Sequence, residues 1–190
     1  MIRLGTLLKK EDAVRQLKNW NEKAKKNYQT KLYDPELKTY IYFDLRADKP
    51  MKYVSSSSFT PLFAGIPSKE VATEMANRYF REGSFSGKNN FFLLCASFDP
   101  ESEHFDPKRY WRGPVWINLN WILYRGFKRY GMEDLADQIK SDTLFLLKKH
   151  GFYEYFDPRR DIHQQSDAGY GGNNFSWSAA LYIDLLKNKH

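Results

Sequence analysis

The chain has 190 residues, a formal net charge of +7 and aromatic side chains at 17% of its positions. Its length fits a single domain, residues 1–190, with enough chain to bury a sizeable core. The single cysteine, Cys95, excludes an intrachain disulfide framework, and its place in an apolar run predicts a buried thiol. The four histidines lack the spacing of a zinc site, so we expect no metal and no other cofactor.

The positive charge raises the question of nucleic-acid or membrane partners. The basic residues are spread along the chain among acids, and the run at 23–26 fits the solvated face of a helix. No nucleic-acid-binding motif is present, so we rank that function class third and expect no nucleic-acid partner. The absence of a signal-peptide pattern and of a long apolar span predicts a cytoplasmic protein without a membrane partner.

The first half of the chain predicts helices of two kinds. Apolar residues at near-helical spacing predict an amphipathic helix over 11–29, which Pro35 would end. Residues 40–44 predict an extended segment, and the mostly apolar stretch 55–65 predicts a short buried helix. A second amphipathic helix is expected over 68–83, with the serine at its start as the N-cap.

The second half continues the alternation. Residues Pro114 to Tyr130 are apolar on nearly every side, which predicts a buried helix with the proline in its first turn and Gly131 after its end. Residues 132–150 predict an amphipathic helix that Gly151 stops, and residues 174–186 predict a final buried helix. Alternation of buried and half-buried helices is typical of two concentric layers, whereas an ordinary bundle would make every helix amphipathic. We therefore expect an all-α fold, a partial (α/α)6 toroid of about half a barrel.

The segment Tyr110 to Trp116 enters the first long buried helix and combines two indoles, a guanidinium and a Gly-Pro pair. Sugars bind through C–H faces stacked on aromatic rings and through hydrogen bonds to their hydroxyls, and this residue set supplies both. A tryptophan-rich core turn, with Arg112 neutralising a buried carboxylate, is the open alternative.

A carboxylate among aromatic residues, Glu154, follows the helix that Gly151 stops. The helix dipole and the neighbouring rings both disfavour a charge there, which is typical of a general base. A surface glutamate, or a partner for Arg112, remains the alternative. Asp157, directly before Pro158, predicts a turn residue.

The glycine-rich stretch 169–177 lacks the lysine and the preceding strand of a phosphate-binding loop. Its glycines would let the backbone approach a ligand closely, and Trp177 would line the cavity. Asn174 or Ser176 is expected to cap the last helix.

Several separated motifs together resemble one enzyme family. Tyr-Trp-Arg-Gly-Pro-Val-Trp-Ile-Asn at 110–118, Asn-Trp-Ile-Leu-Tyr at 120–124, Gly-Phe-x-Glu-Tyr-Phe-Asp-Pro at 151–158 and Phe-Ser-Trp-x-Ala-Ala-Leu at 175–181 occur in the order found in glycoside hydrolase family 63. The stretch Ser-Phe-Thr-Pro-Leu-Phe-Ala-Gly-Ile at 58–66 also fits. The resemblance is nearest to the mannosylglycerate and glucosylglycerate hydrolase branch.

This resemblance implies an (α/α)6 barrel that hydrolyses α-glycosides with inversion. It assigns Glu154 as the general base, which is the one catalytic residue expected on this chain. The residues expected to bind substrate are Tyr110, Trp111, Arg112, Gly113, Trp116, Tyr155 and Trp177.

Half of the catalytic machinery is expected to lie elsewhere. An inverting mechanism needs two carboxyl groups about 6.5–9.5 Å apart, and the family's acid precedes the base by more chain than is present here. The full toroid also has twice as many helices as this sequence predicts. We therefore expect a C-terminal half that is inactive alone and is completed by an N-terminal half chain or by self-association. A non-catalytic carbohydrate-binding or structural remnant is the alternative.

Overall fold

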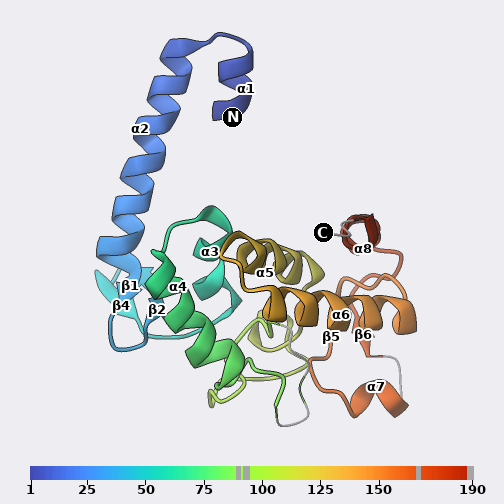
Figure 1. The fold of residues 1–190 in the computed structure, drawn as a ribbon. Helices are drawn as coiled ribbons and strands as arrows, with labels where there is room; N and C mark the ends of the chain where they lie inside the picture. Colours follow the sequence, from blue (N-terminus) through green and yellow to red (C-terminus); the bar gives the residue numbers. More distant parts are fainter. Residues whose placement is uncertain (89–90, 92–94, 166–167, 188–190) are drawn as a thin grey trace.

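The computed structural model describes residues 1–88, 91, 95–165 and 168–187, and helices dominate it (Figure 1). The strict all-α prediction is incomplete, because three small antiparallel ribbons join the helices: β1 with β2, β3 with β4, and β5 with β6. The strands are β1 (Tyr33–Asp34), β2 (Thr39–Tyr40), β3 (Tyr42–Asp44), β4 (Lys49–Met51), β5 (Tyr155–Phe156) and β6 (Gly169–Tyr170).

The helices follow the predicted order, with additional short turns between them. The α-helices are α1 (Ile2–Leu7), α2 (Glu11–Asn27), α3 (Pro61–Ala64), α4 (Lys69–Met75), α5 (Ile117–Arg129), α6 (Glu133–His150), α7 (Ile162–Gln165) and α8 (Ser176–Lys187). The tighter or wider helical turns are η1 (Tyr28–Leu32), η2 (Ser56–Phe59), η3 (Ala76–Arg81) and η4 (Tyr110–Arg112).

The N-terminal helices form a hairpin that projects from the body of the molecule (Figure 1). The amphipathic helix predicted from Glu11 is confirmed as α2, and helical structure continues through η1 to Leu32 before the strand that precedes Pro35. The short helix α1 was not predicted. All residues of α1 and α2 are described and none is buried, so neither helix contributes to the core.

The core is built around Phe59, which lies on the predicted short buried helix. Its ring contacts those of Tyr79, Phe80 and Phe85 at centroid distances of 5.2, 4.7 and 5.1 Å. Phe80 in turn lies edge-on to Phe127 of α5, at 5.0 Å. These contacts join η2, η3 and α5 through edge-to-face packing, the arrangement that aromatic quadrupoles favour.

The helices α3, α5 and α8 lie in one row, because α5 packs against both of the others. Helix α6 covers α5 and α8 from a second layer (Figure 1). An ion pair connects η3 to α6, because Nη2 of Arg81 lies 2.9 Å from Oδ1 of Asp134. The packing of α5 against α6 fits the predicted order of one buried and one amphipathic helix, but α2, predicted as an amphipathic helix, has no buried residue and packs in neither layer.

The predicted N-cap of α4 and the predicted glycines after α5 and α6 are confirmed. The Ser68 hydroxyl accepts a hydrogen bond from the Val71 amide at 3.3 Å, as an N-cap does. Gly131 and Gly151 follow α5 and α6 with φ of +71° and +86°, a region that favours glycine. Cys95 is buried as predicted, and burial raises the pKa of its thiol; residues 92–94 of its apolar run lie outside the described residues.

The predicted start of α5 at Pro114 is wrong. The helix begins at Ile117, and Trp116 has extended backbone angles of −114° and 122°. The reason is a long-range pairing, in which the Val115 amide donates to the Phe156 carbonyl at 2.8 Å and the Phe156 amide donates back at 2.9 Å. A residue whose backbone groups pair with a distant strand cannot also start a helix.

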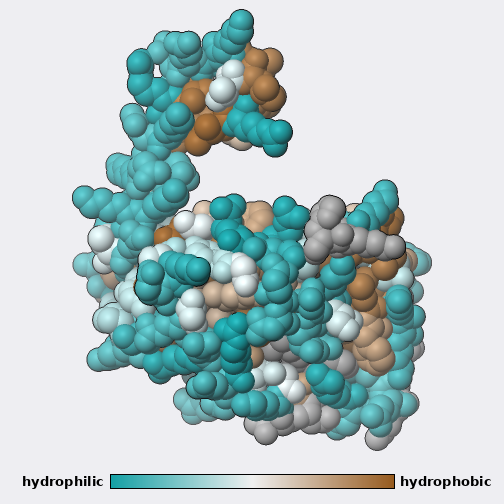
Figure 2. Space-filling model, in the orientation of Figure 1, coloured by the Kyte–Doolittle hydropathy of each residue, from teal (hydrophilic) through white to brown (hydrophobic). Residues whose placement is uncertain are grey.

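The prediction that α8 is buried all round is also wrong. Only Ser178 and Leu185 of its described residues are buried, while Ile183 is 51% and Leu186 42% exposed. Helix α8 ends the row and contacts α5 and α6 on one side, which leaves apolar surface near it open to solvent (Figure 2). None of the described helices combines the length and apolar character needed to cross a bilayer.

The α3–α5 contact predicts a cost for adding a single methyl group at Gly126. A Cβ there would lie 2.9 Å from Leu62 Cβ and 3.1 Å from the Phe63 amide nitrogen. Gly126→Ala should lower the free energy of unfolding by about 1–3 kcal/mol, because this overpacking outweighs the better helix propensity of alanine. Urea denaturation measures the change, with the exposed Ser141→Ala in α6 as the control; a more stable Gly126→Ala would contradict the packing.

Candidate active site

The backbone brings together the segments that the sequence singled out. The Glu154 amide donates to the Gly172 carbonyl at 3.0 Å, and the Phe175 amide donates to the Phe152 carbonyl at 2.6 Å. The pairing at Val115 joins the third segment to these two. Segments 110–116, 151–158 and 169–177 therefore meet at one place, at the starts of α5 and α8.

A stack of aromatic rings forms the centre of this place. The indoles of Trp111 and Trp116 are parallel, with centroids 3.9 Å apart and an angle of 5° between their planes. Tyr155 also stacks on Trp116 at 4.9 Å, and Tyr110 meets Trp116 edge-on at 4.8 Å. Four of the predicted substrate-binding residues thus form one cluster.

The cluster has an exposed part and a buried part. Tyr110 is 48% and Trp111 45% exposed, whereas Trp116 is fully buried and its Nε1 donates to the Tyr110 carbonyl at 3.2 Å. Trp116 therefore offers no surface to a ligand in this structure and instead supports the two exposed rings. The most accessible rings for a sugar face are therefore those of Tyr110 and Trp111.

Glu154 lies at the edge of this cluster. The Tyr110 hydroxyl donates to Glu154 Oε1 across 3.4 Å, a long contact. Desolvation and the adjacent Glu154 carboxylate raise the pKa of Tyr110, so its hydroxyl stays protonated and remains a donor. Tyr110 has a φ of +34°, outside the common regions for a residue with a side chain, and such strained backbone is characteristic of functional sites.

The glycines of the third segment make room for protein atoms. Gly171 has a φ of +73°, and a Cβ there would lie 2.4 Å from Glu154 Oε2. A Cβ on Gly169 would lie 2.2 Å from the Tyr153 ring. The expectation that these glycines admit a ligand is therefore revised for both: they admit Tyr153 and the Glu154 carboxylate.

Arg112 and Gly113 both lie close to backbone carbonyl groups. Arg112 donates through Nε to the His104 carbonyl at 2.9 Å, and within the described part of the chain it forms no ion pair with Glu154. Gly113 is buried, and a Cβ there would lie 2.1 Å from the Asp106 carbonyl oxygen. Gly113 therefore allows a close contact with the backbone at Asp106.

Trp177 completes the cluster from the first turn of α8. Its ring lies edge-on to Trp116 at 6.0 Å and to Phe175 at 4.8 Å. The Nε1 atom is buried, and among the described residues it has no hydrogen-bond partner. A buried indole N–H without an acceptor is uncommon.

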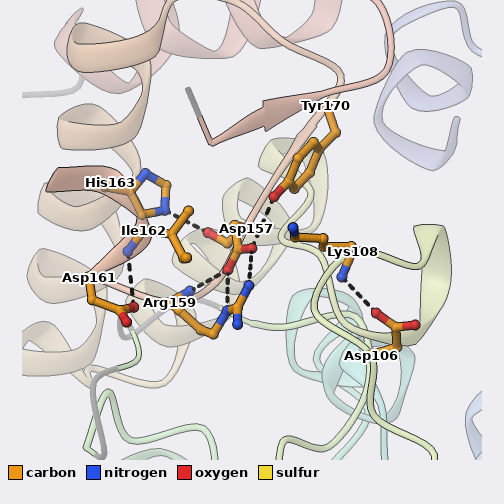
Figure 3. A network of polar contacts seen from close by, with 8 residues as sticks. All are labelled: Asp106, Lys108, Asp157, Arg159, Asp161, Ile162, His163 and Tyr170. Carbon is orange, nitrogen blue, oxygen red and sulfur yellow. Dashed lines mark hydrogen bonds and ion pairs between the residues drawn. The ribbon is translucent and has the colours of Figure 1, made fainter. Parts of the chain in front are cut away.

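The sequence did not reveal a buried polar network next to Glu154, centred on Asp157 (Figure 3). The carboxylate of Asp157 is fully buried and accepts hydrogen bonds from the Arg159 guanidinium at 2.9 and 2.8 Å and from the Tyr170 hydroxyl at 3.1 Å. His163 Nε2 lies 2.8 Å from the Asp157 carbonyl oxygen. The turn predicted at Asp157 is confirmed, since the Arg159 amide donates to Asp157 Oδ1 at 3.0 Å. In the sequence, the wider network is indicated only by the spacing of Asp157 and Arg159, two residues apart.

Comparison with known proteins identifies the family of this chain. Residues 1–178 match the mannosylglycerate hydrolase MGH1-like glycoside hydrolase domain, and the chain belongs to this family. The chain is 43% identical over 152 residues to the mannosylglycerate hydrolase of Thermus thermophilus, a match that covers 80% of this chain and 34% of the relative. The relative from Rubrobacter radiotolerans is 38% identical over 156 residues, covering 82% and 34%.

Solved structures agree with this assignment. The family 63 mannosylglycerate hydrolase from Thermus thermophilus in complex with Tris superposes with a TM-score of 0.85 at 36% identity, covering 98% of this chain and 42% of that chain. The neutral trehalase Nth1 from Saccharomyces cerevisiae, at 20% identity and a TM-score of 0.70, shares the fold over 93% of this chain and 31% of its own. The chain spans about a third of the length of its curated relatives and corresponds to their C-terminal region.

The contact between Gly171 and Glu154 predicts a coupling that stability measurements can detect. Gly171→Ala should destabilise the fold by more than the penalty of about 1–2 kcal/mol for a left-handed alanine, because its methyl group also meets the Glu154 carboxylate. Gly131→Ala is the matched control, since its φ is +71° and nothing lies within 4 Å of the added atom.

Adding Glu154→Ala to Gly171→Ala should remove part of the excess destabilisation, because the carboxylate is gone while Glu154 Cβ and Tyr155 Cε1, each 2.9 Å from the added atom, remain. A double-mutant cycle from urea denaturation measures this coupling. Equal losses for Gly171→Ala and Gly131→Ala, with no coupling to Glu154, would contradict the geometry.

Proposed function

We propose that the chain is the C-terminal half of the catalytic domain of an inverting α-glycoside hydrolase, with Glu154 as its general base. The observation that carries this proposal is the position of Glu154. It is the carboxylate of the family motif, and it borders both the exposed rings and the Tyr110 hydroxyl. A general base must lie where a substrate and a water molecule can both reach it.

The hydrogen bonding of Glu154 suits this role. Oε1 accepts from Tyr110, and within the described residues Oε2 accepts no hydrogen bond. The first contact orients the carboxylate, and the second oxygen is available to take a proton from an attacking water. Inversion requires the water to attack the face of the sugar opposite the leaving group.

The substrate class follows from the family and from the exposed rings. The related enzymes include a glucosylglycerate hydrolase from Mycolicibacterium hassiacum at 31% identity, and the Thermus thermophilus enzyme has been solved in complex with glucose. We therefore propose an α-mannoside or α-glucoside such as mannosylglycerate or glucosylglycerate. Tyr110 and Trp111 would stack on the sugar.

The general acid has to come from another source. Asp157 is the nearest carboxylate in sequence, but it is fully buried and bound to Arg159 and Tyr170, so it cannot protonate a glycosidic oxygen. We propose that the part of the family domain that this chain does not cover supplies the acid, or else a second copy completes the site. The row formed by α3, α5 and α8 would then be half of the inner ring of a toroid, whose apolar edge at α8 packs against the missing half.

Reconstitution tests the proposal. The chain alone should not hydrolyse mannosylglycerate or glucosylglycerate, whereas its fusion behind the N-terminal region of the Thermus thermophilus relative should. Glu154→Gln in that fusion should lower kcat by about a thousandfold or more, because the water loses its base. Release of free sugar measures the activity.

The control is Glu101→Gln, an exposed carboxylate in a loop, which should leave the rate unchanged. Full activity of Glu154→Gln would overturn the base assignment. An inactive fusion that binds mannosylglycerate with wild-type affinity whether or not Glu154 is present would favour the alternative of a non-catalytic carbohydrate-binding fragment.

A further inference from the structure

We infer that Asp157, Arg159 and Tyr170 form a positioning triad that holds the Glu154 carboxylate in its place beside the rings. The role of Glu154 as base rests on the proposed function, but the geometric claim stands apart from it. None of the triad was among the residues predicted to act in the site. Within the described residues the side chains of the triad hydrogen-bond to one another and not to Glu154, so we assign them as positioning residues and not catalytic residues.

The triad is an ion pair between the buried Asp157 carboxylate and the partly exposed Arg159, joined by the Tyr170 hydroxyl. Three hydrogen bonds reach the Asp157 carboxylate from the Arg159 amide and guanidinium, at 3.0, 2.9 and 2.8 Å, and a fourth comes from the Tyr170 hydroxyl at 3.1 Å. A fully buried carboxylate is tolerable only when it is paired in this way. A guanidinium fork that binds both oxygens also fixes the orientation of the carboxylate.

The triad fixes the register of the ribbon that carries Glu154. Strand β5 pairs with β6 so that Tyr155 opposes Tyr170, and the Asp157 amide donates to the Ala168 carbonyl at 2.9 Å. The Tyr170 hydroxyl then reaches back to Asp157 on the opposite strand. This side-chain bond locks the pairing, because a slip of one residue would move Tyr170 to the other face.

The same register places Gly171 against Glu154. The Glu154 amide donates to the Gly172 carbonyl at 3.0 Å, and Gly171 leaves just enough room for Oε2. A one-residue shift of β6 in one direction would put Tyr170 in the place of Gly171 and bring its side chain toward that oxygen. The triad therefore acts on Glu154 through the strand opposite it, and it keeps the carboxylate near Tyr110.

A substitution at Tyr170 can test the positioning role without removing the buried charge of Asp157. Burial, followed by the Asp157 charge, raises the pKa of Tyr170 to about 12, so its hydroxyl is a permanent donor at neutral pH. Tyr170→Phe removes only that hydroxyl and keeps the ring, whose centroid lies 5.9 Å from that of Tyr155. Asp157→Asn is the stronger variant and removes the charge.

A matched control exists on the β1–β2 ribbon. Asp34 is also a buried turn carboxylate, with Oδ1 accepting from the Glu36 and Leu37 amides at 2.9 Å and Oδ2 lying 3.2 Å from Lys52 Nζ. It belongs to a different ribbon from Glu154. Asp34→Asn should therefore cost stability, as the Asp157 variant does, without disturbing Glu154.

The experiment uses the full chain labelled with ¹³C-glutamate at the side-chain carboxyl. The Glu154 signal is assigned by its loss in Glu154→Gln, and all spectra are recorded at pH 7.5 without ligand. Tyr170→Phe and Asp157→Asn should move the Glu154 signal toward that of an unstructured glutamate, while Asp34→Asn should leave it in place. A Glu154 signal that does not move in folded Tyr170→Phe and Asp157→Asn would overturn the proposal, even if Glu154 is the base.

Kinetics of the fusion with the Thermus thermophilus N-terminal region then test the consequence for catalysis. Tyr170→Phe should lower kcat about tenfold to a hundredfold with KM for mannosylglycerate within about twofold of wild type, since a misplaced base slows the chemical step but not binding. A change in KM alone, or no change in either, would overturn the positioning role. Loss of activity in the wild-type fusion would count against the proposed function, and the NMR result would still decide the triad.

Discussion

The reciprocal backbone pairing of Val115 with Phe156 is the interaction on which the site depends. It holds the residues before α5 in an extended conformation and fixes strand β5, which directly follows Glu154. The rings at 110–116 therefore lie beside the carboxylate. The two hydrogen bonds are buried and therefore costly to break. The stacked indoles and the ribbon of β5 and β6 directly adjoin this pairing, since Trp116 follows Val115 and Phe156 belongs to β5.

Two supporting structures then prepare the exposed groups for a ligand. Trp116 is buried between the other rings and holds Trp111 and Tyr110 at the surface, and the polar network around Asp157 holds the strand behind Glu154. Rigid support of this kind is what a carboxylate needs to act on a bound water with the correct geometry. In the proposed function, the exposed apolar side of α8 is where the missing half of the domain packs.

Features set by nearby residues could be predicted from the sequence. Gly131, Gly151 and the Ser68 cap depend on local backbone geometry, and the family motif pointed to Glu154. The start of α5 could not be predicted, because Val115 pairs with a residue far away in the sequence. The role of Asp157 was hidden for a similar reason: its turn is local, but Tyr170 reaches it from the opposite strand. The burial of Trp116 and the exposure of α8 likewise follow from which helices are neighbours.

The most direct test of Glu154 as the base is chemical rescue of Glu154→Ala in the fusion with the Thermus thermophilus N-terminal region. Azide can enter the space left by the carboxylate and attack the sugar without needing a base. We predict that sodium azide restores turnover of mannosylglycerate and yields the β-mannosyl azide, the product of attack on the face opposite the α-linked leaving group. Hydrolysis by Glu154→Ala at the wild-type rate, or an α-azide product, would contradict the assignment.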